Sequence, residues 1–288
     1  MDEFGARFRH SIITMRRSYN EQLPISRLPV ELFINIIHLA VHGDPALHYT
    51  TLYKLVGVSS RWASWINSSS SLWSIIHARH TSQLQATTLA RSGTSLLSLI
   101  DDVVGVPGKL AFLANTLPHV YRWRSFEYGG NRAVSDYYLN DLVDAPAPKL
   151  ESLIIDVLRG LNMKVDLFRG EAPRLQHLEL SGCPIPWESN MLSGLKTLKL
   201  MYLGTLGPSM DQVIGILLAS PALVDLVLGS LFERSQDIVT SNSRTIELPY
   251  LRSLSLTGLS SVAIALLFTP HTARISASIY KRIEVTFK

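Results

Sequence analysis

The stretch Pro173-Arg-Leu175-Gln-His-Leu178-Glu-Leu180 decides the fold, because its spacing of apolar residues returns four more times along the chain. All five copies fit Leu-x-x-Leu-x-Leu, with isoleucine in the last position once, and they begin at Leu150, Leu175, Leu195, Leu223 and Leu251. The intervals between these first residues are 25, 20, 28 and 28 residues. A recurring unit of this length predicts a stacked array of repeats.

The local pattern of each copy predicts a β-strand with one apolar face. Leu178 and Leu180 lie two residues apart, so both point to one side of a strand while Glu179 points to the other. A single strand cannot bury that side, whereas stacked neighbours can. Spacing and period are typical of leucine-rich repeats. Four copies follow a proline that would begin the strand after a turn, at Pro148, Pro173, Pro221 and Pro249.

The segments around these copies predict connections and weaker units. Helices are expected over Met210–Ala219 and Ser260–Phe268. The first two strands would be Leu96–Ile100 and Leu117–Phe126, with a helix over Lys109–Thr116 between them. The C-terminal stretch Ile275–Val285 is expected to supply one more strand or a cap, because terminal repeats deviate from the pattern.

The variable residues beside the leucines are the candidates for binding a ligand. They are mixed in charge and size, which suits a protein partner without identifying it. The alternative is a solvated face with no ligand. The residues nominated for target binding are Glu151, His177, Glu179, Lys196, Lys199, Asp225 and Arg252.

Near the N-terminus, three short helices are expected within about fifty residues. The first follows Leu28-Pro29 and carries apolar residues at spacings of three and four, which are Leu32, Phe33, Ile36, Ile37 and Ala40. Gly43-Asp44-Pro45 ends it. The second runs from Thr51 to Val58, and the third begins at Ser59 or Ser60, either of which could cap it. So small a bundle usually has a partner.

These helices carry a family resemblance. Leu28-Pro29-x-Glu31-Leu32, Ile36-Ile37, Leu55-Val56-x-Val58-Ser59-x-x-Trp62 and Leu72-Trp73 resemble the F-box, the module that binds the Skp-family adaptor of SCF-type ubiquitin ligases. The match covers residues 25–76, about a fifth of the chain. With Asn20-x-x-Leu23-Pro24-Ile25-Ser26-Arg27 and the insertion Val41–Thr51, the chain is similar to F-box proteins of mushroom-forming fungi with degenerate leucine-rich repeats. Ser59 departs from the family, which often has cysteine there.

The resemblance implies an architecture and a function. The expected fold is α/β: a helical or disordered extension over 1–24, a three-helix F-box-like domain over 25–76, and an irregular leucine-rich-repeat solenoid of parallel strands over 77–288. The implied function is the substrate-recognition subunit of an SCF-type ligase, with the adaptor, a cullin-based ligase and an unknown protein substrate as partners. The implied adaptor-binding residues are Leu28, Pro29, Leu32, Ile36, Leu55, Val56, Val58 and Trp62. Each could instead pack inside its own bundle.

The motifs of the sequence predict no enzyme, no cofactor and no metal site. His77 and His80 could share a helix face, but no acidic residue or cysteine stands at matching spacing. Cys183 is better explained by packing than as a nucleophile. Neither a Gly-x-Ser-x-Gly elbow nor a phosphate-binding loop is present. Two alternatives remain open: a leucine-repeat scaffold with no ligase role, and a hydrolase, which would need a nucleophile, a base and an orienting acid to converge.

The composition limits the classes of protein and the cell compartments that fit this sequence. The chain of 288 residues is 47% hydrophobic and 17% charged, so it should fold. Its net charge of +4 comes from scattered residues rather than a basic stripe, which disfavours nucleic acid. A single cysteine and the lack of an apolar run of about 18 residues favour a soluble cytoplasmic or nuclear protein without a membrane partner. The alternative for residues 1–20 is an amphipathic transit peptide, which Asp2 and Glu3 disfavour.

Overall fold

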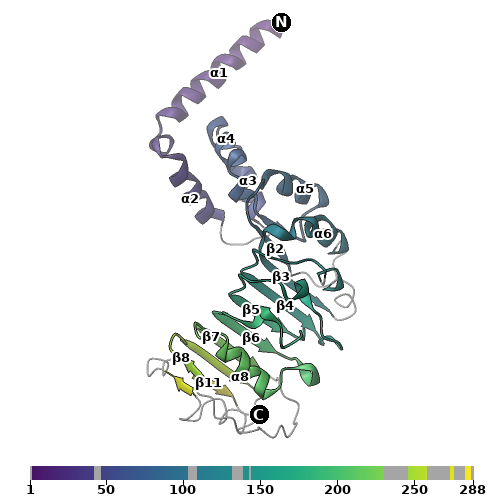
Figure 1. The fold of residues 1–288 in the computed structure, drawn as a ribbon. Helices are drawn as coiled ribbons and strands as arrows, with labels where there is room; N and C mark the ends of the chain where they lie inside the picture. The colour runs from purple at the N-terminus through teal and green to yellow at the C-terminus, as the bar shows by residue number, and fades with distance from the viewer. Residues whose placement is uncertain are drawn as a thin grey trace. The chain divides into compact units, whose positions relative to one another are not determined.

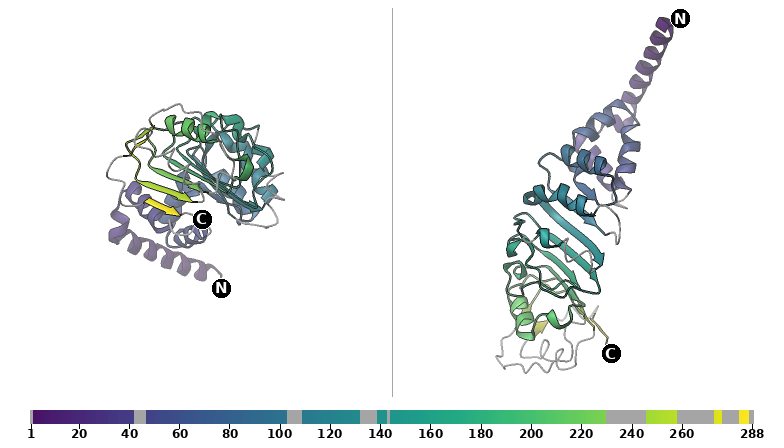
Figure 2. Two further views of the ribbon diagram at one scale, coloured as in Figure 1. Left: turned by 90° about the horizontal axis from the view of Figure 1, so that it is seen from below. Right: turned by 90° about the vertical axis from the view of Figure 1, so that its right-hand side faces the viewer.

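The computed structural model describes residues 2–41, 47–102, 109–131, 139–142, 144–229, 246–257, 273–275 and 283–286. The chain divides into two compact units, Met1–Ser95 and Leu96–Lys288. Figure 1 gives the labels of the helices and strands used below, and Figure 2 shows two further views.

The first unit is mainly helical. Its elements are α1 (Asp2–Gln22), the 3-10 turn η1 (Pro24–Arg27), α2 (Val30–Val41), α3 (His48–Val56), α4 (Ser60–Ser68), η2 (Ser70–Trp73), β1 (Ile75–His77) and α5 (Ser82–Arg91). Ser59 caps α4, since its hydroxyl accepts a hydrogen bond from the Trp62 amide at 3.2 Å. The Arg91 guanidinium lies over the Trp73 ring, 4.4 Å from its centroid, so α5 belongs to the same packed unit as η2.

The second helix of the predicted module begins earlier than the sequence pattern indicated. We expected Thr51–Val58, with the preceding residues in an inserted loop, but α3 spans His48–Val56. Its first turn is anchored by tertiary contacts: a ring nitrogen of His48 hydrogen-bonds the Leu72 carbonyl at 2.9 Å, and the Tyr49 ring stacks on Trp73. These contacts are distant in sequence, so the local pattern of leucines did not reveal them.

The second unit is built on an open, all-parallel sheet. Its eight described strands follow the order β2 (Leu97–Asp101), β3 (Trp123–Asn131), β4 (Ser152–Leu158), β5 (His177–Ser181), β6 (Thr197–Met201), β7 (Asp225–Gly229), β9 (Ser253–Thr257) and β11 (Ile283–Thr286). Two further short strands, β8 (Ile246–Leu248) and β10 (Ala273–Ile275), pair with each other. The α/β class is therefore confirmed.

The predicted apolar pattern forms two continuous ladders across this sheet. Leu178 pairs with Leu153 on one side and Leu198 on the other, and the ladder continues through Leu226 and Leu254. The second ladder, two residues along, contains Leu180 and Leu200. All of these side chains are buried. The parallel strands predicted at the five leucine-rich copies are confirmed.

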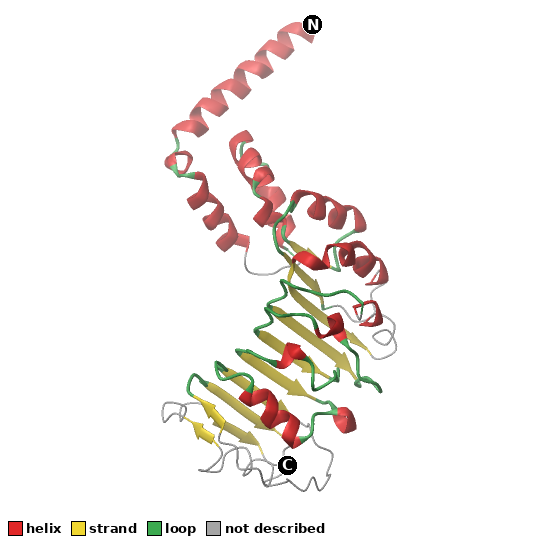
Figure 3. Ribbon diagram, in the orientation of Figure 1, coloured by secondary structure: helices red, strands yellow, loops and turns green. Residues whose placement is uncertain are grey.

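Helices and 3-10 turns connect the strands and lie along one side of the sheet (Figure 3). They are α6 (Lys109–Thr116), η3 (Leu117–Arg122), η4 (Leu139–Leu142), η5 (Leu167–Gly170), η6 (Asn190–Leu192), η7 (Gly204–Leu206) and α8 (Met210–Leu218). The predicted helices at Lys109 and Met210 are confirmed, whereas the one predicted over Ser260–Phe268 lies outside the described residues. Of the C-terminal stretch, β11 supplies a strand beside β9.

The prediction that a strand begins at Leu117 was wrong. Residues 117–122 form the 3-10 turn η3, and β3 starts at Trp123. The indole nitrogen of Trp123 donates a hydrogen bond to the Thr116 carbonyl at 3.2 Å, so the chain turns back on the end of α6 before it extends. Among the described residues, no helix has both the length and the apolar character needed to cross a bilayer.

Candidate binding surfaces

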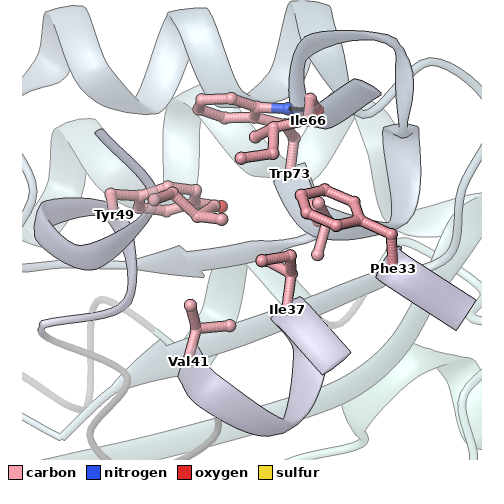
Figure 4. Packing of buried hydrophobic residues seen from close by; sticks show 8 residues of the cluster. Phe33, Ile37, Val41, Tyr49, Ile66 and Trp73 are labelled. Atoms are coloured by element: carbon pink, nitrogen blue, oxygen red, sulfur yellow. Dashed lines mark hydrogen bonds between the residues drawn. The ribbon is translucent and has the colours of Figure 1, made fainter. Parts of the chain in front are cut away.

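The helices of the first unit are fixed by a shared aromatic core (Figure 4). Phe33 and Ile37 from α2, Tyr49 from α3, Ile66 from α4 and Trp73 from η2 are all buried. The Trp73 indole donates a hydrogen bond to the Ile66 carbonyl at 2.9 Å, and its ring stacks on Tyr49 with centroids 5.5 Å apart. The surface outside this core is therefore held in one arrangement.

Helix α2 also has an apolar stripe that this core does not use. Leu32, Ile36 and Leu39 lie at spacings of four and three, and each is exposed, Leu39 by 78%. Phe33 and Ile37 follow Leu32 and Ile36 by one residue, which turns them about 100° away and into the core. A contiguous exposed apolar stripe on a packed helix marks a surface for a partner.

The eight nominated adaptor-binding residues divide into two groups. Five do not belong to the aromatic core and are exposed or half-buried: Leu28, Pro29, Leu32, Ile36 and Val58. The other three are also half-buried, but they pack against the aromatic core: Leu55, Val56 and Trp62. The Trp62 and Phe33 rings make a T-shaped contact with centroids 4.9 Å apart, so the first role of Trp62 is structural. Leu39 was not nominated, although its position three residues after Ile36 would have identified it.

The second unit offers the side of the sheet opposite the leucine ladders, which no described helix of 96–288 covers. There the side chains of Ile154, Glu179, Lys199 and Val227 form a row across β4 to β7, each half-buried. Glu179 and Lys199 form an ion pair at 2.6 Å with side chains 27% and 33% exposed. Because these side chains are half-buried and paired across neighbouring strands, the charges of Glu179 and Lys199 keep fixed positions on this face.

The seven nominated target-binding residues do not all reach this face. Four lie on it, in strands β5, β6 and β7: His177, Glu179, Lys199 and Asp225. Here a ring nitrogen of His177 hydrogen-bonds the Thr197 hydroxyl at 3.0 Å. The other three lie one residue before their strands: Glu151, Lys196 and Arg252. Their backbone groups link neighbouring repeats. For example, the Glu151 carbonyl accepts hydrogen bonds from the Gln176 and His177 amides.

A groove of about 710 Å³ lies at the carboxyl-terminal end of this face. Its walls include Glu127, Asp156 and Glu179, and exposed Leu158 and Tyr202 stand beside them. Burial, and then the neighbouring carboxylates Asp102 and Glu179, raise the pKa of Glu127. The groove therefore combines acidic and apolar groups with the basic Arg159 at the edge of the charged row.

Sequence reasoning missed Glu127 for an identifiable reason. In β3, aromatic residues occupy the positions that leucine and isoleucine take in the next strand, since Phe126 pairs with Leu153 and Tyr128 with Ile155. The predicted strand ended at Phe126, because a search for leucine alone does not extend this repeat, whereas a search for any large apolar residue two positions apart would have reached Tyr128 and placed Glu127 beside Ile154.

The residues considered as metal ligands or as a nucleophile are buried or take part in local structure. His77 lies buried in β1, so the predicted helix face shared with His80 is wrong. Its ring accepts the Arg79 amide at 3.0 Å, closing a tight turn. Cys183 is fully buried, and burial raises its thiol pKa to about 12. Among the described residues, no three His, Cys, Asp or Glu side chains are grouped as metal ligands.

Comparison with known proteins finds no matching family model, no similar curated protein and no similar solved structure.

Proposed function

We propose that this chain is the substrate-recognition subunit of an SCF-type ubiquitin ligase. In this proposal the helical module within 25–76 is an F-box that binds a Skp-family adaptor, and residues 77–288 form a leucine-rich-repeat solenoid that binds a protein target. The chain itself performs no catalysis. It accelerates ubiquitin transfer by holding the target near the conjugating enzyme, which raises the effective concentration of the reacting groups.

The observation that carries this proposal is that α2 has apolar residues on two of its sides. One side of the helix, with Phe33 and Ile37, completes the module's own core, while Leu32, Ile36 and Leu39 remain exposed on another. Fully burying a leucine or isoleucine side chain contributes roughly 1.5–3 kcal/mol. Because these three are only partly exposed, their burial would contribute about 4 kcal/mol in all, which makes the stripe one part of a larger interface.

The charged face of the sheet supports the target-binding half of the proposal. His177, Glu179, Lys199 and Asp225 alternate with the buried ladder and keep their positions through cross-strand pairing. A rigid, polar face with apolar groups at its rim suits recognition of a folded or extended protein segment. The same arrangement also fits a repeat scaffold with no ligase role, which adaptor binding distinguishes.

The test is co-purification of the full chain with a purified Skp-family adaptor. We expect a stable complex, weakened on the order of 30-fold by Leu32→Ser/Ile36→Ser, because about 2 kcal/mol of apolar burial is lost. Tyr121→Ser is the matched control, since Tyr121 is 55% exposed against 51% for Leu32 but lies in the other unit. Leu28→Ala/Pro29→Ala examines the start of α2 in the same assay.

Circular dichroism and urea unfolding must show that each variant retains its fold. A well-folded wild-type chain that fails to bind the adaptor would refute the ligase role and favour the scaffold. Equal losses for Leu32→Ser/Ile36→Ser and Tyr121→Ser would show that the α2 stripe is not the binding surface.

A further inference from the structure

Helix α1 carries a second exposed apolar stripe, distinct from that of α2. Phe4, Phe8, Ile12, Met15 and Tyr19 follow one another at spacings of four, four, three and four. At about 100° per residue these side chains fall within an arc of about 80° along one side of the helix. Ile12 is half-buried, and the other four are 60 to 81% exposed. Three of the five are aromatic.

The polar side of α1 is strongly basic. Between Phe4 and Asn20 the helix contains four arginines and no aspartate or glutamate. By the same angular spacing, Arg9 and Arg16 flank one edge of the stripe and Arg7 the other, about 80–100° from its centre. The long arginine side chains can extend past the edge of an apolar stripe while their methylenes remain against it.

The remaining side of α1 lines a groove within the first unit. Ile13, Arg16, Arg17 and Asn20 border a space of about 380 Å³ together with Gly57, from the turn between α3 and α4, and Arg61, from the first turn of α4. The Ser26 hydroxyl donates to the Asn20 carbonyl at 2.6 Å and joins the end of α1 to η1. Because Ile13 lies about 140° from the centre of the stripe, the stripe faces away from this groove.

Charge decides what can cover the stripe. A second copy of α1 would bring the flanking arginines of two helices together without an acidic residue between Phe4 and Asn20 to offset them. A bilayer surface with anionic headgroups instead accepts the phenylalanines among its acyl chains and the arginines at its phosphates. Tyrosine and other aromatic side chains favour the same interfacial depth.

We propose that α1 is a membrane-surface anchor that lies in the plane of an anionic bilayer, with the Phe4–Tyr19 stripe immersed. About 16 residues at 1.5 Å each make an in-plane segment of roughly 24 Å. This inference is independent of the ligase proposal. It departs from the expectation that no membrane is a partner, which rested on the lack of a spanning segment, because an interfacial helix needs only an apolar stripe and a cationic border.

The test is co-sedimentation of the full chain with vesicles of phosphatidylcholine containing one-third phosphatidylserine. We expect binding that falls when salt is raised and that is weak on pure phosphatidylcholine. Phe4→Ser/Phe8→Ser should weaken binding by about tenfold or more per phenylalanine. Arg7→Gln/Arg9→Gln should weaken it by about tenfold or more on the anionic vesicles and have little effect on the neutral ones.

The matched control is Ile13→Ser, which removes an exposed apolar side chain from the opposite side of the same helix. It should bind the vesicles like the wild type. Equal losses for Ile13→Ser and Phe4→Ser/Phe8→Ser, or a folded wild-type chain that remains in the supernatant with anionic vesicles, would overturn the proposal. A lipid-free dimer abolished by Phe4→Ser/Phe8→Ser, without vesicle binding, would assign the stripe to a second copy instead.

Discussion

Substituting alanine for Gly182 should destabilise the second unit far more than the same substitution at Gly194. Both glycines have positive φ, +62° and +71°, so both variants place a side chain in the left-handed region. That conformation costs about 1–2 kcal/mol, partly offset because alanine restricts the unfolded chain by roughly 0.4–1 kcal/mol. The shared net loss is therefore about 1 kcal/mol.

The two positions differ in the space around an added methyl group. At Gly194 no atom lies within 4 Å of the new Cβ, whereas at Gly182 the Cβ would overlap the Val157 carbonyl oxygen and lie 2.9 Å from the Gly160 Cα. The backbone must move, although Gly182 donates to the Met201 carbonyl at 2.9 Å and accepts from the Leu161 amide at 2.8 Å. Weakening two or three such bonds at about 1 kcal/mol each brings the expected loss to about 3–4 kcal/mol.

Equilibrium urea unfolding measures the difference, with the free energy taken from the linear dependence on denaturant. Because the chain has two compact units, the transition of the second must be followed separately, and the reaction of the single, buried Cys183 with a thiol reagent reports on that unit. Losses for Gly182→Ala and Gly194→Ala that agree within about 0.5 kcal/mol would show that the close approach of the backbone at Gly182 contributes nothing, and the steric argument would be refuted.

Three other results follow from buried groups. Burial, and then His77 and His48, lower the pKa of His80 to about 4, so its neutral form stabilises the fold above about pH 6.5. That contribution is lost as the pH falls toward 4, and urea unfolding should show a loss of about 1–2 kcal/mol after solvent screening. The His80→Asn variant should have a flatter pH dependence. Cys183, with its pKa raised to about 12 by burial, should react with a disulfide reagent only as the second unit unfolds, and rapid labelling of the native chain would contradict the assigned burial. Leu198→Ala, in the middle of the buried ladder, should cost about 3–4 kcal/mol, against less than about 1 kcal/mol for Lys199→Met one residue along; similar losses would mean that the two faces are not distinct.

Local periodicity accounts for the part of the fold that could be predicted. Leu178 and Leu180 lie two apart in one short segment, and the same pattern in the neighbouring repeats fixes both the strands and their register. Features that depend on residues distant in sequence were not predicted. The start of α3 is set by contacts to η2, and the turn before Trp123 by its hydrogen bond to the end of α6.

The candidate surfaces were predicted only in part for a similar reason. Leu32 and Ile36 followed from the F-box resemblance, but whether Trp62 faced a partner or the core depended on Phe33, which the motif does not address. On the sheet, Glu179 and Lys199 followed from alternation along the strand. The groove beyond them also needs Tyr202 and Leu158, whose positions are set by the turns after the strands rather than by the repeat.

The order of strands in the sheet has a consequence for how the chain emerges from the ribosome. From β2 to β7 each strand pairs with the one that precedes it along the chain, and β9 follows β7 directly in the sheet. Within this sheet every strand from β3 onward therefore meets a finished edge as soon as it is synthesised; β8, which pairs with the later β10, is the exception among the described strands. Assembly can proceed from the N-terminal side at the pace of translation, since only the connection to the preceding strand of the sheet must close at each step.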